Sequence, residues 1–165
     1  MDRLILLRHG KAESESASGE DFDRRLAPRG VRESAAMARS LAELGFLPDV
    51  ALVSAASRTR DTWAAAETAF PGAEVSFVGD LYNSDSEGVR QIAQAAGRAA
   101  GTVLVIGHNP GLQELTVRLL AEGHAPSTLI HRAQHRFPTA AASVFLFDAQ
   151  GRPHYDGLFY PERGD

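Results

Sequence analysis

A short apolar stretch, then a polar turn, then an amphipathic helix recurs at least three times in this chain, and this order restricts the folds open to it. The apolar stretches are residues 4–7, 50–53 and 102–106. Strands that alternate with helices in this way are typical of a parallel sheet covered by helices on both faces. We therefore predict an α/β fold, a three-layer α/β/α arrangement with a mostly parallel central sheet.

The predicted helices carry their apolar residues at helical spacing. They span residues 31–44, 59–70 and 87–100, the last capped by Ser86. A further helix follows residue 110, because four leucines recur there on one face: Leu112, Leu115, Leu119 and Leu120.

The remaining segments complete the sheet. Residues 74–78 alternate like a strand, which predicts that Val75, Phe77 and Leu81 face inward. A strand is predicted over 142–147 and an edge strand or tail over 154–160. Residues 126–138 receive no assignment.

Composition excludes several classes of protein. A chain of 165 residues suits a single domain, here residues 1–165. No apolar run approaches the roughly 20 residues that cross a bilayer, so we expect no membrane insertion. The absence of Cys excludes disulfides and thiolate chemistry, and together with an N-terminus unlike a secretory signal it predicts a cytoplasmic protein. A net charge of −4 argues against nucleic-acid binding, which needs a basic face.

Arginine and histidine side chains follow three of the predicted strands. Arg8 and His9 come after the first, Ser54 and Arg58 after the second, and His108 after the strand over 102–106. The carboxyl ends of parallel strands share one edge of a sheet, and ligands bind there. Two guanidinium groups and two imidazoles at that edge form an anion site, because guanidinium matches phosphate oxygens in bidentate geometry. The sequence thus predicts a phosphate-binding site.

Three motifs resemble those of a known family. The strings LLRHGKAE, SAASRTRDT and VIGHNPG are similar, in order and spacing, to the signatures of the histidine phosphatase superfamily. This resemblance implies a phosphoglycerate mutase-like fold. The small size, the Lys11-Ala12-Glu13 continuation and the late FPTAAASV segment resemble the SixA-like phosphohistidine phosphatase branch.

The resemblance implies a role for each residue of the anion site. His9 would be the nucleophile that accepts the phosphoryl group, while Arg8, Arg58 and His108 would hold the phosphoryl oxygens. A neutral imidazole nitrogen can attack phosphorus when its other ring nitrogen donates to a fixed acceptor. Phosphoryl transfer depends on positioning and electrostatics, and two arginines can supply both. We therefore expect no metal and no other cofactor.

Four further residues are expected to support this site. Gly10 would let the chain pass close to the phosphoryl group, and Ser54 and Thr62 would position Arg58. Asn109 would orient the turn after its strand without reacting.

A general acid is harder to identify. Larger superfamily members use an acidic residue to protonate an ester oxygen, and Asp80 and Glu87 are the nearest candidates, although neither stands in a recognisable motif. An alkoxide needs that proton to leave, whereas the imidazole of phosphohistidine can be protonated by solvent at its remote nitrogen. This difference favours P–N hydrolysis.

Three functions remain open at this point. The first is a phosphatase acting on phosphohistidine in a protein, and the second is a broad phosphomonoesterase acting on small phosphorylated metabolites. The third is an idle module that binds phosphate or a phosphoprotein, against which the intact His9 argues. A metal at His131 and His135 is not expected, because no Glu completes an HExxH pattern.

Overall fold

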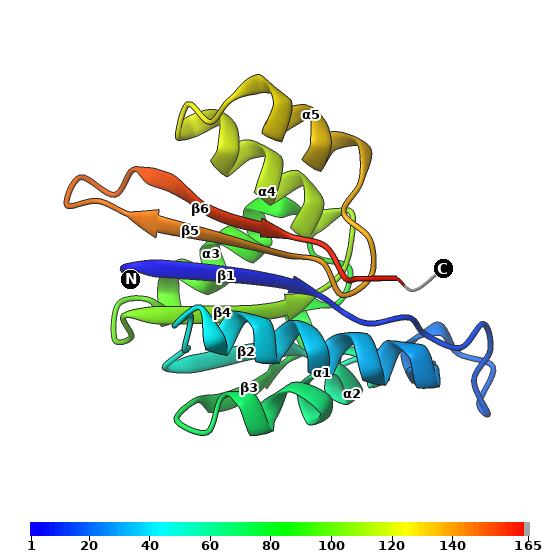
Figure 1. Cartoon of the computed structure of the whole chain (residues 1–165). Helices are drawn as coiled ribbons and strands as arrows, with labels where there is room; N and C mark the ends of the chain where they lie inside the picture. The colour runs from blue at the N-terminus through cyan, green and yellow to red at the C-terminus, as the bar shows by residue number, and fades with distance from the viewer. Residues whose placement is uncertain (164–165) are drawn as a thin grey trace.

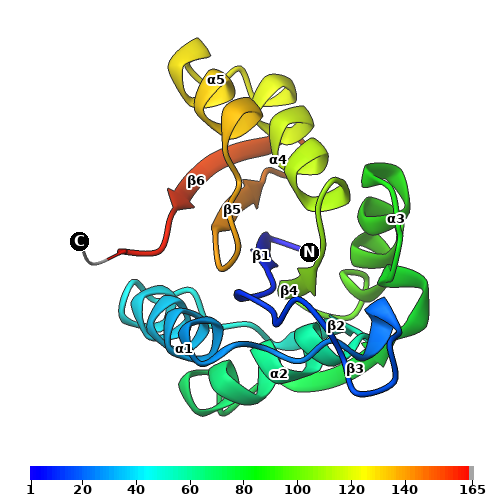
Figure 2. The same ribbon diagram turned by 90° about the vertical axis from the view of Figure 1, so that its right-hand side faces the viewer.

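The computed structural model describes residues 1–163, which form a six-stranded sheet between two layers of helices (Figures 1 and 2). The strand order is β3-β2-β4-β1-β5-β6. The first four strands in this order are mutually parallel, while β5 runs antiparallel to both β1 and β6. The strands are β1 (Arg3–Arg8), β2 (Val50–Ser54), β3 (Glu74–Val78), β4 (Thr102–Gly107), β5 (Ala142–Phe147) and β6 (Pro153–Phe159).

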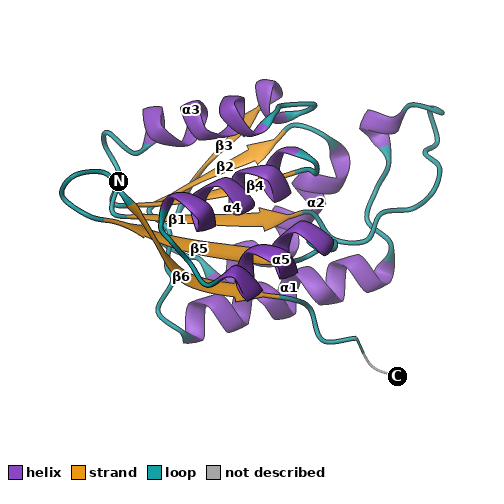
Figure 3. Ribbon diagram, turned by 90° about the horizontal axis from the view of Figure 1, so that it is seen from above, coloured by secondary structure: helices purple, strands orange, loops and turns teal. Residues whose placement is uncertain are grey.

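Helices cover both faces of the sheet, which confirms the predicted three-layer arrangement (Figure 3). On one face lie α1 (Pro28–Glu43) and α2 (Ser57–Ala66), and on the other lie α3 (Ser86–Ala96), α4 (Gly111–Glu122) and α5 (Ser127–His135). Short 3-10 helices add η1 (Asp21–Asp23), η2 (Glu67–Ala69) and η3 (Gly79–Leu81). Within the described residues, no helix is both long enough and apolar enough to cross a membrane.

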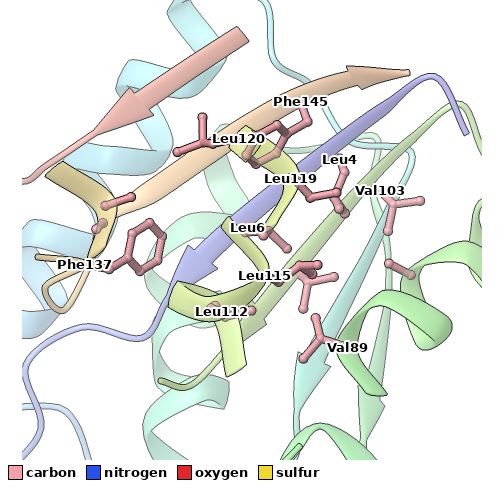
Figure 4. Close-up of a cluster of buried hydrophobic side chains, with 14 of the residues drawn as sticks. Leu4, Leu6, Val89, Val103, Leu112, Leu115, Leu119, Leu120, Phe137 and Phe145 are labelled. Atoms are coloured by element: carbon pink, nitrogen blue, oxygen red, sulfur yellow. The ribbon is translucent and has the colours of Figure 1, made fainter. Parts of the chain in front are cut away.

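The first strand lies at the centre of the core because its side chains are apolar on both faces. Leu4 and Leu6 pack with the leucines of α4, a cluster that Figure 4 shows, while Ile5 and Leu7 pack against α1 and α2. Burying a leucine or isoleucine side chain contributes about 1.5–3 kcal/mol relative to exposure. These four residues therefore fix β1 firmly, and with it the chain that leaves its carboxyl end.

The predicted inward orientation was wrong for Val75 and Phe77 and correct for Leu81. Val75 and Phe77 are 39% and 43% exposed, and only Leu81 is buried. The reason is that β3 is the edge strand, which pairs only with β2 and has little helix over it. The guanidinium of Arg60 lies 4.1 Å from the centre of the Phe77 ring and partly covers it.

The helix after β3 also differs from the prediction. Its cap is Asp85, whose side chain accepts from the Gly88 N–H, whereas Ser86 is already in the helix and accepts from Arg118. An Asp in this position satisfies a free N–H at the start of the helix. The helix ends at Ala96 instead of residue 100.

Two segments near the carboxyl terminus were left without a definite assignment by the sequence, and the structure assigns both. The unassigned residues 126–138 contain α5, and β6 is an edge strand that pairs with β5.

Candidate active site

The sheet brings the predicted residues together at one edge. In register, Arg8 pairs with Gly107 and Leu7 with Ile106, while Val53 also pairs with Ile106. The residues that follow these three neighbouring strands therefore meet, and Figure 1 shows β1 and β4 ending side by side. His9, Ser54 and His108 are all placed there by strand ends rather than by loop conformation.

His9 is held as a neutral ring with one free nitrogen. Its Nδ1 lies 2.7 Å from the backbone oxygen of Gly10, which can only accept, so Nδ1 carries the proton and Nε2 does not. The side chain is only 8% exposed. Burial, and then the nearby His108 and Arg8, lower the pKa of His9 to about 3. At neutral pH the unprotonated Nε2 can act as a nucleophile.

His108 lies against His9, with 5.3 Å between ring centres. Its Nε2 is 2.7 Å from the Ser54 hydroxyl, and its buried Nδ1 has no hydrogen-bond partner within residues 1–163. Burial, and then the charge of Arg58, lower its pKa to about 4. Ser54 therefore supports His108. It also contacts the start of the helix that carries Arg58, as expected, because its carbonyl oxygen accepts from the Thr59 hydroxyl at 2.7 Å.

Arg58 comes from the first turn of α2 and is only 7% exposed. Its Nη1 donates to the Asp21 backbone oxygen at 2.9 Å, and its Nη2 to the Asp21 carboxylate at 3.1 Å. Thr62 donates to the Arg58 backbone oxygen and accepts from the Gly10 N–H at 3.1 Å. Thr62 thus joins the Arg58 helix to the chain beside His9.

Arg8 is anchored by a distant carbonyl. Its Nη1 donates to the Phe137 oxygen at 3.0 Å, and the side-chain amide of Asn109 donates to the same oxygen at 2.8 Å. Burial, and then the charges of Arg58 and Arg163, lower the pKa of Arg8. An arginine stays protonated in a protein, so burying its charge beside another guanidinium costs free energy. Binding of an anion between the guanidinium groups offsets that cost.

Gly10 is required for close packing of the chain, while its predicted role beside the phosphoryl group stays a prediction. A Cβ at this position would lie 2.5 Å from the Ser34 hydroxyl and 2.6 Å from the Gly30 oxygen. In the same contact, a Cβ on Gly30 would lie 2.1 Å from the Lys11 oxygen. These glycines let helix α1 pack directly against the chain that carries His9.

Two residues of the site were missed by the sequence analysis. Asp21 accepts from Arg58 and also from the Tyr82 hydroxyl at 2.6 Å. The Tyr82 ring stands edge-on to His108, with 5.5 Å between ring centres. Asp21 lies in a polar loop whose residues carry no pattern, and the one available signal was that a buried Arg58 requires an acidic partner.

Within residues 1–163, no hydrogen bond or ion pair joins the two residues proposed as general acid to the groups of the site. Glu87 pairs with Arg118 at 3.2 Å, on the outer side of α3 and α4. Asp80 is exposed within η3, and among the described residues no ion pair or hydrogen bond of its side chain reaches the site. His131 and His135 are exposed on α5, and residues 1–163 contain no group of three or more His, Cys, Asp or Glu side chains that could hold a metal ion.

Comparison with known proteins agrees with this site. The sequence model of the histidine phosphatase superfamily (branch 1) matches residues 4–81. A solved structure of a candidate phosphohistidine phosphatase SixA from Agrobacterium tumefaciens is 30% identical, with a TM-score of 0.84 over 97% of this chain and 98% of that one. The chain belongs to the histidine phosphatase superfamily, in its SixA-like branch.

Two other comparisons cover nearly the whole chain. A protein histidine phosphatase SixA complexed with tungstate is 25% identical, with a TM-score of 0.77 over 96% of this chain and 97% of that one. An uncharacterised chloroplastic protein of Arabidopsis thaliana is 28% identical over 97% of this chain and 78% of its own length. Membership of the superfamily supports phosphatase activity and confirms the phosphoglycerate mutase-like fold.

Proposed function

We propose that this phosphatase removes the phosphoryl group from phosphohistidine in a protein substrate, through a phosphoryl intermediate on His9. One observation carries the proposal: the Gly10 oxygen fixes the His9 proton on Nδ1, which leaves Nε2 unprotonated among two arginines and a second histidine. This is the arrangement that a histidine nucleophile needs.

The first chemical step transfers the phosphoryl group to the enzyme. The Nε2 lone pair of His9 forms a bond to phosphorus, while the P–N bond to the substrate imidazole breaks and its electron pair stays on the departing nitrogen. Arg8, Arg58 and His108 hold the three equatorial oxygens and stabilise their charge. His108 can donate from Nδ1 because the Ser54 hydroxyl can donate to its Nε2.

In the second step water attacks the phosphoryl group on His9. The P–N bond breaks again, inorganic phosphate leaves, and His9 returns to its neutral form. Both steps use the same oxygen-binding groups, so we expect the two guanidinium groups to make a metal ion unnecessary. A chelator should leave the rate unchanged.

The acidic residue at the site favours a nitrogen leaving group. Hydrogen bonds from Tyr82, Arg24 and Arg58 hold the pKa of Asp21 well below its usual range. An ionised carboxylate cannot donate the proton that an alkoxide leaving group requires. We therefore expect phosphohistidine to be a better substrate for this site than a phosphate ester. A protein substrate agrees with the similarity to the SixA structure complexed with tungstate, which is that of a protein histidine phosphatase.

Turnover of a substrate panel tests the proposal. Phosphohistidine peptide and several phosphomonoesters are assayed with wild type, His9→Ala and the exposed control His131→Ala. We expect preference for phosphohistidine, loss of activity in His9→Ala and normal activity in His131→Ala. Preference for esters would support the phosphomonoesterase instead, and phosphate binding without turnover would support the binding module. Full activity of His9→Ala would exclude His9 as nucleophile.

A further inference from the structure

Asp21 occupies an outer position at the site. Its side chain is 52% exposed, whereas that of its partner Arg58 is 9% exposed. It is presented by a loop that closes on itself, because Ala12 and Leu26 form an antiparallel bridge at the loop base. Asp61 on α2 accepts from the Leu26 N–H and pairs with Arg25, which ties the loop to the helix that carries Arg58.

Aromatic rings connect this outer carboxylate with the buried nucleophile. The His9 and His108 rings are in contact and tilted relative to each other. His108 and Tyr82 form an edge-to-face pair, and so do Tyr82 and Phe22, with 5.0 Å between the ring centres of the latter two. Phe22 is exposed and follows Asp21 in the loop. The site thus has His9 at its buried end and Asp21, Phe22 and Tyr82 at its solvent end.

The solvent end is where the leaving group must lie. In phosphoryl transfer the attacking and leaving atoms are roughly in line through phosphorus. Since His9 attacks from the buried end, the leaving imidazole lies on the solvent side, where it remains attached to its protein. The groups that these contacts place on the solvent side include the aromatic rings and the carboxylate of Asp21.

We infer that Asp21 and Tyr82 recognise the leaving imidazole of a phosphohistidine substrate, with the Asp21 carboxylate accepting a hydrogen bond from the remote ring N–H. This inference rests on the proposed function and adds the residues that select the leaving group. Asp21 has the capacity for the contact, because within residues 1–163 Oδ2 accepts from Tyr82 and Arg58 while Oδ1 accepts only from Arg24. A carboxylate oxygen can accept two hydrogen bonds.

The contact would favour the reactive form of the substrate. Phosphohistidine protonated on its remote nitrogen is cationic, and it leaves as neutral imidazole when the P–N electron pair returns to the ring. Asp21 neither gives nor takes a proton in this step. Its charge stabilises the cationic ring, and the same charge opposes a leaving group that departs as an anion.

The experiment compares two leaving groups in one enzyme. The kcat/KM for a phosphohistidine peptide is divided by the kcat/KM for p-nitrophenyl phosphate, whose leaving group is an anion. We expect Asp21→Asn to lower this ratio by about tenfold or more, because a hydrogen bond to a charged group is lost. The control Glu20→Gln removes a neighbouring exposed carboxylate of the same loop and should leave the ratio unchanged.

A purely structural role for Asp21 predicts another result. If Asp21 only positions Arg58, the variant loses activity toward both substrates equally and the ratio stays constant, which would overturn the inference. Tyr82→Leu removes the aromatic ring that the inference places against the leaving imidazole, so it should also lower the ratio if Asp21→Asn does not fold, and an unchanged ratio again overturns the inference. Wild type that hydrolyses the ester but not phosphohistidine would overturn the proposed function itself.

Discussion

The Ser54 hydroxyl lies 2.7 Å from Nε2 of His108, and it joins the ends of two neighbouring strands, β2 and β4. Both side chains are held by backbone that the core fixes, so the imidazole has little freedom to rotate. A hydroxyl can donate or accept, and when it donates to Nε2 the neutral ring carries its proton on Nδ1. A single buried hydroxyl therefore orients the His108 ring, and in that tautomer it leaves Nδ1 as the donor to a phosphoryl oxygen.

Substituting Ser54→Ala should lower kcat more than it raises KM. The ring would lose a contact that orients it, and a donor aimed at the transition state would be impaired, at a cost below the about 10²–10³-fold in kcat that follows outright removal of such a donor. Steady-state kinetics measure this, with the exposed Ser40→Ala on α1 as control. Unchanged kcat in Ser54→Ala would show that His108 needs no partner.

Neither His9 nor His108 should gain a proton until the solution is distinctly acidic, because burial lowers their pKa values to about 3 and about 4. The unfolded chain binds these protons near pH 6.5. Between those pH values the unfolded state holds more protons, so the free energy of unfolding falls as pH falls from about 6.5 to about 4. NMR titration of the two ring Cε1–H signals checks this, and a midpoint near 6.5 in the folded protein would contradict it.

Arg58→Lys should lose most of the activity although it keeps the charge. Lysine has no planar fork, so it cannot hold Asp21 through two nitrogens and a phosphoryl oxygen at the same time. We expect kcat to fall by about 10²–10³-fold, as when one oxyanion donor is removed. The exposed Arg60→Lys, two residues further along α2, is the matched control and should behave like wild type.

Gly30→Ala should destabilise the whole fold. Its Cβ would meet the Lys11 backbone oxygen at 2.1 Å, and backbone cannot move aside as a flexible side chain can. Overpacking of this kind costs about 1–3 kcal/mol or more in the free energy of unfolding. Urea denaturation measures it against Gly72→Ala, where an added Cβ meets nothing within 4 Å. Equal stability of the two variants would refute the close contact.

The buried hydroxyls of Thr116 and Ser143 should show strong coupling. They lie 2.8 Å apart between α4 and β5, and neither is accessible to solvent. Thr116→Val alone leaves the buried Ser143 hydroxyl without its hydrogen-bond partner, which should lower the free energy of unfolding by about 1–3 kcal/mol. The double variant with Ser143→Ala removes both groups and should cost less than the sum of the single variants. Additive losses in a thermal or urea double-mutant cycle would rule out the coupling.

The central sheet could be predicted because its signals are local. Leu4 to Leu7 and Val103 to Ile106 are apolar at every position, which indicates strands buried on both faces, and parallel strands then bring Arg8, His9 and His108 to one edge. The exposure of Phe77 could not be predicted in this way. It depends on the place of β3 at the edge of the sheet, which the alternation of its own residues does not report.

The outer part of the site was unpredictable for a related reason. Asp21 and Tyr82 are 61 residues apart, and they meet only because η1 and the segment after η3 fold toward the same strand ends. Neither residue has a local pattern that marks it. Gly10 lies in a recognisable motif, but the motif alone does not indicate which neighbouring residue requires a glycine there.

The bridge between Ala12 and Leu26 has a consequence for how this enzyme can diverge. Residues 13–25 leave and return at a single closed base, and the Ala27 N–H donates to the Lys11 oxygen just outside it. Insertions or replacements within that segment would change the surface that a substrate contacts first. They would leave β1 and α1 in place, because both ends of the segment are held at the bridge. The segment can thus vary in length and sequence on its own, provided that Asp21 is kept, because both Nη atoms of Arg58 donate to that residue.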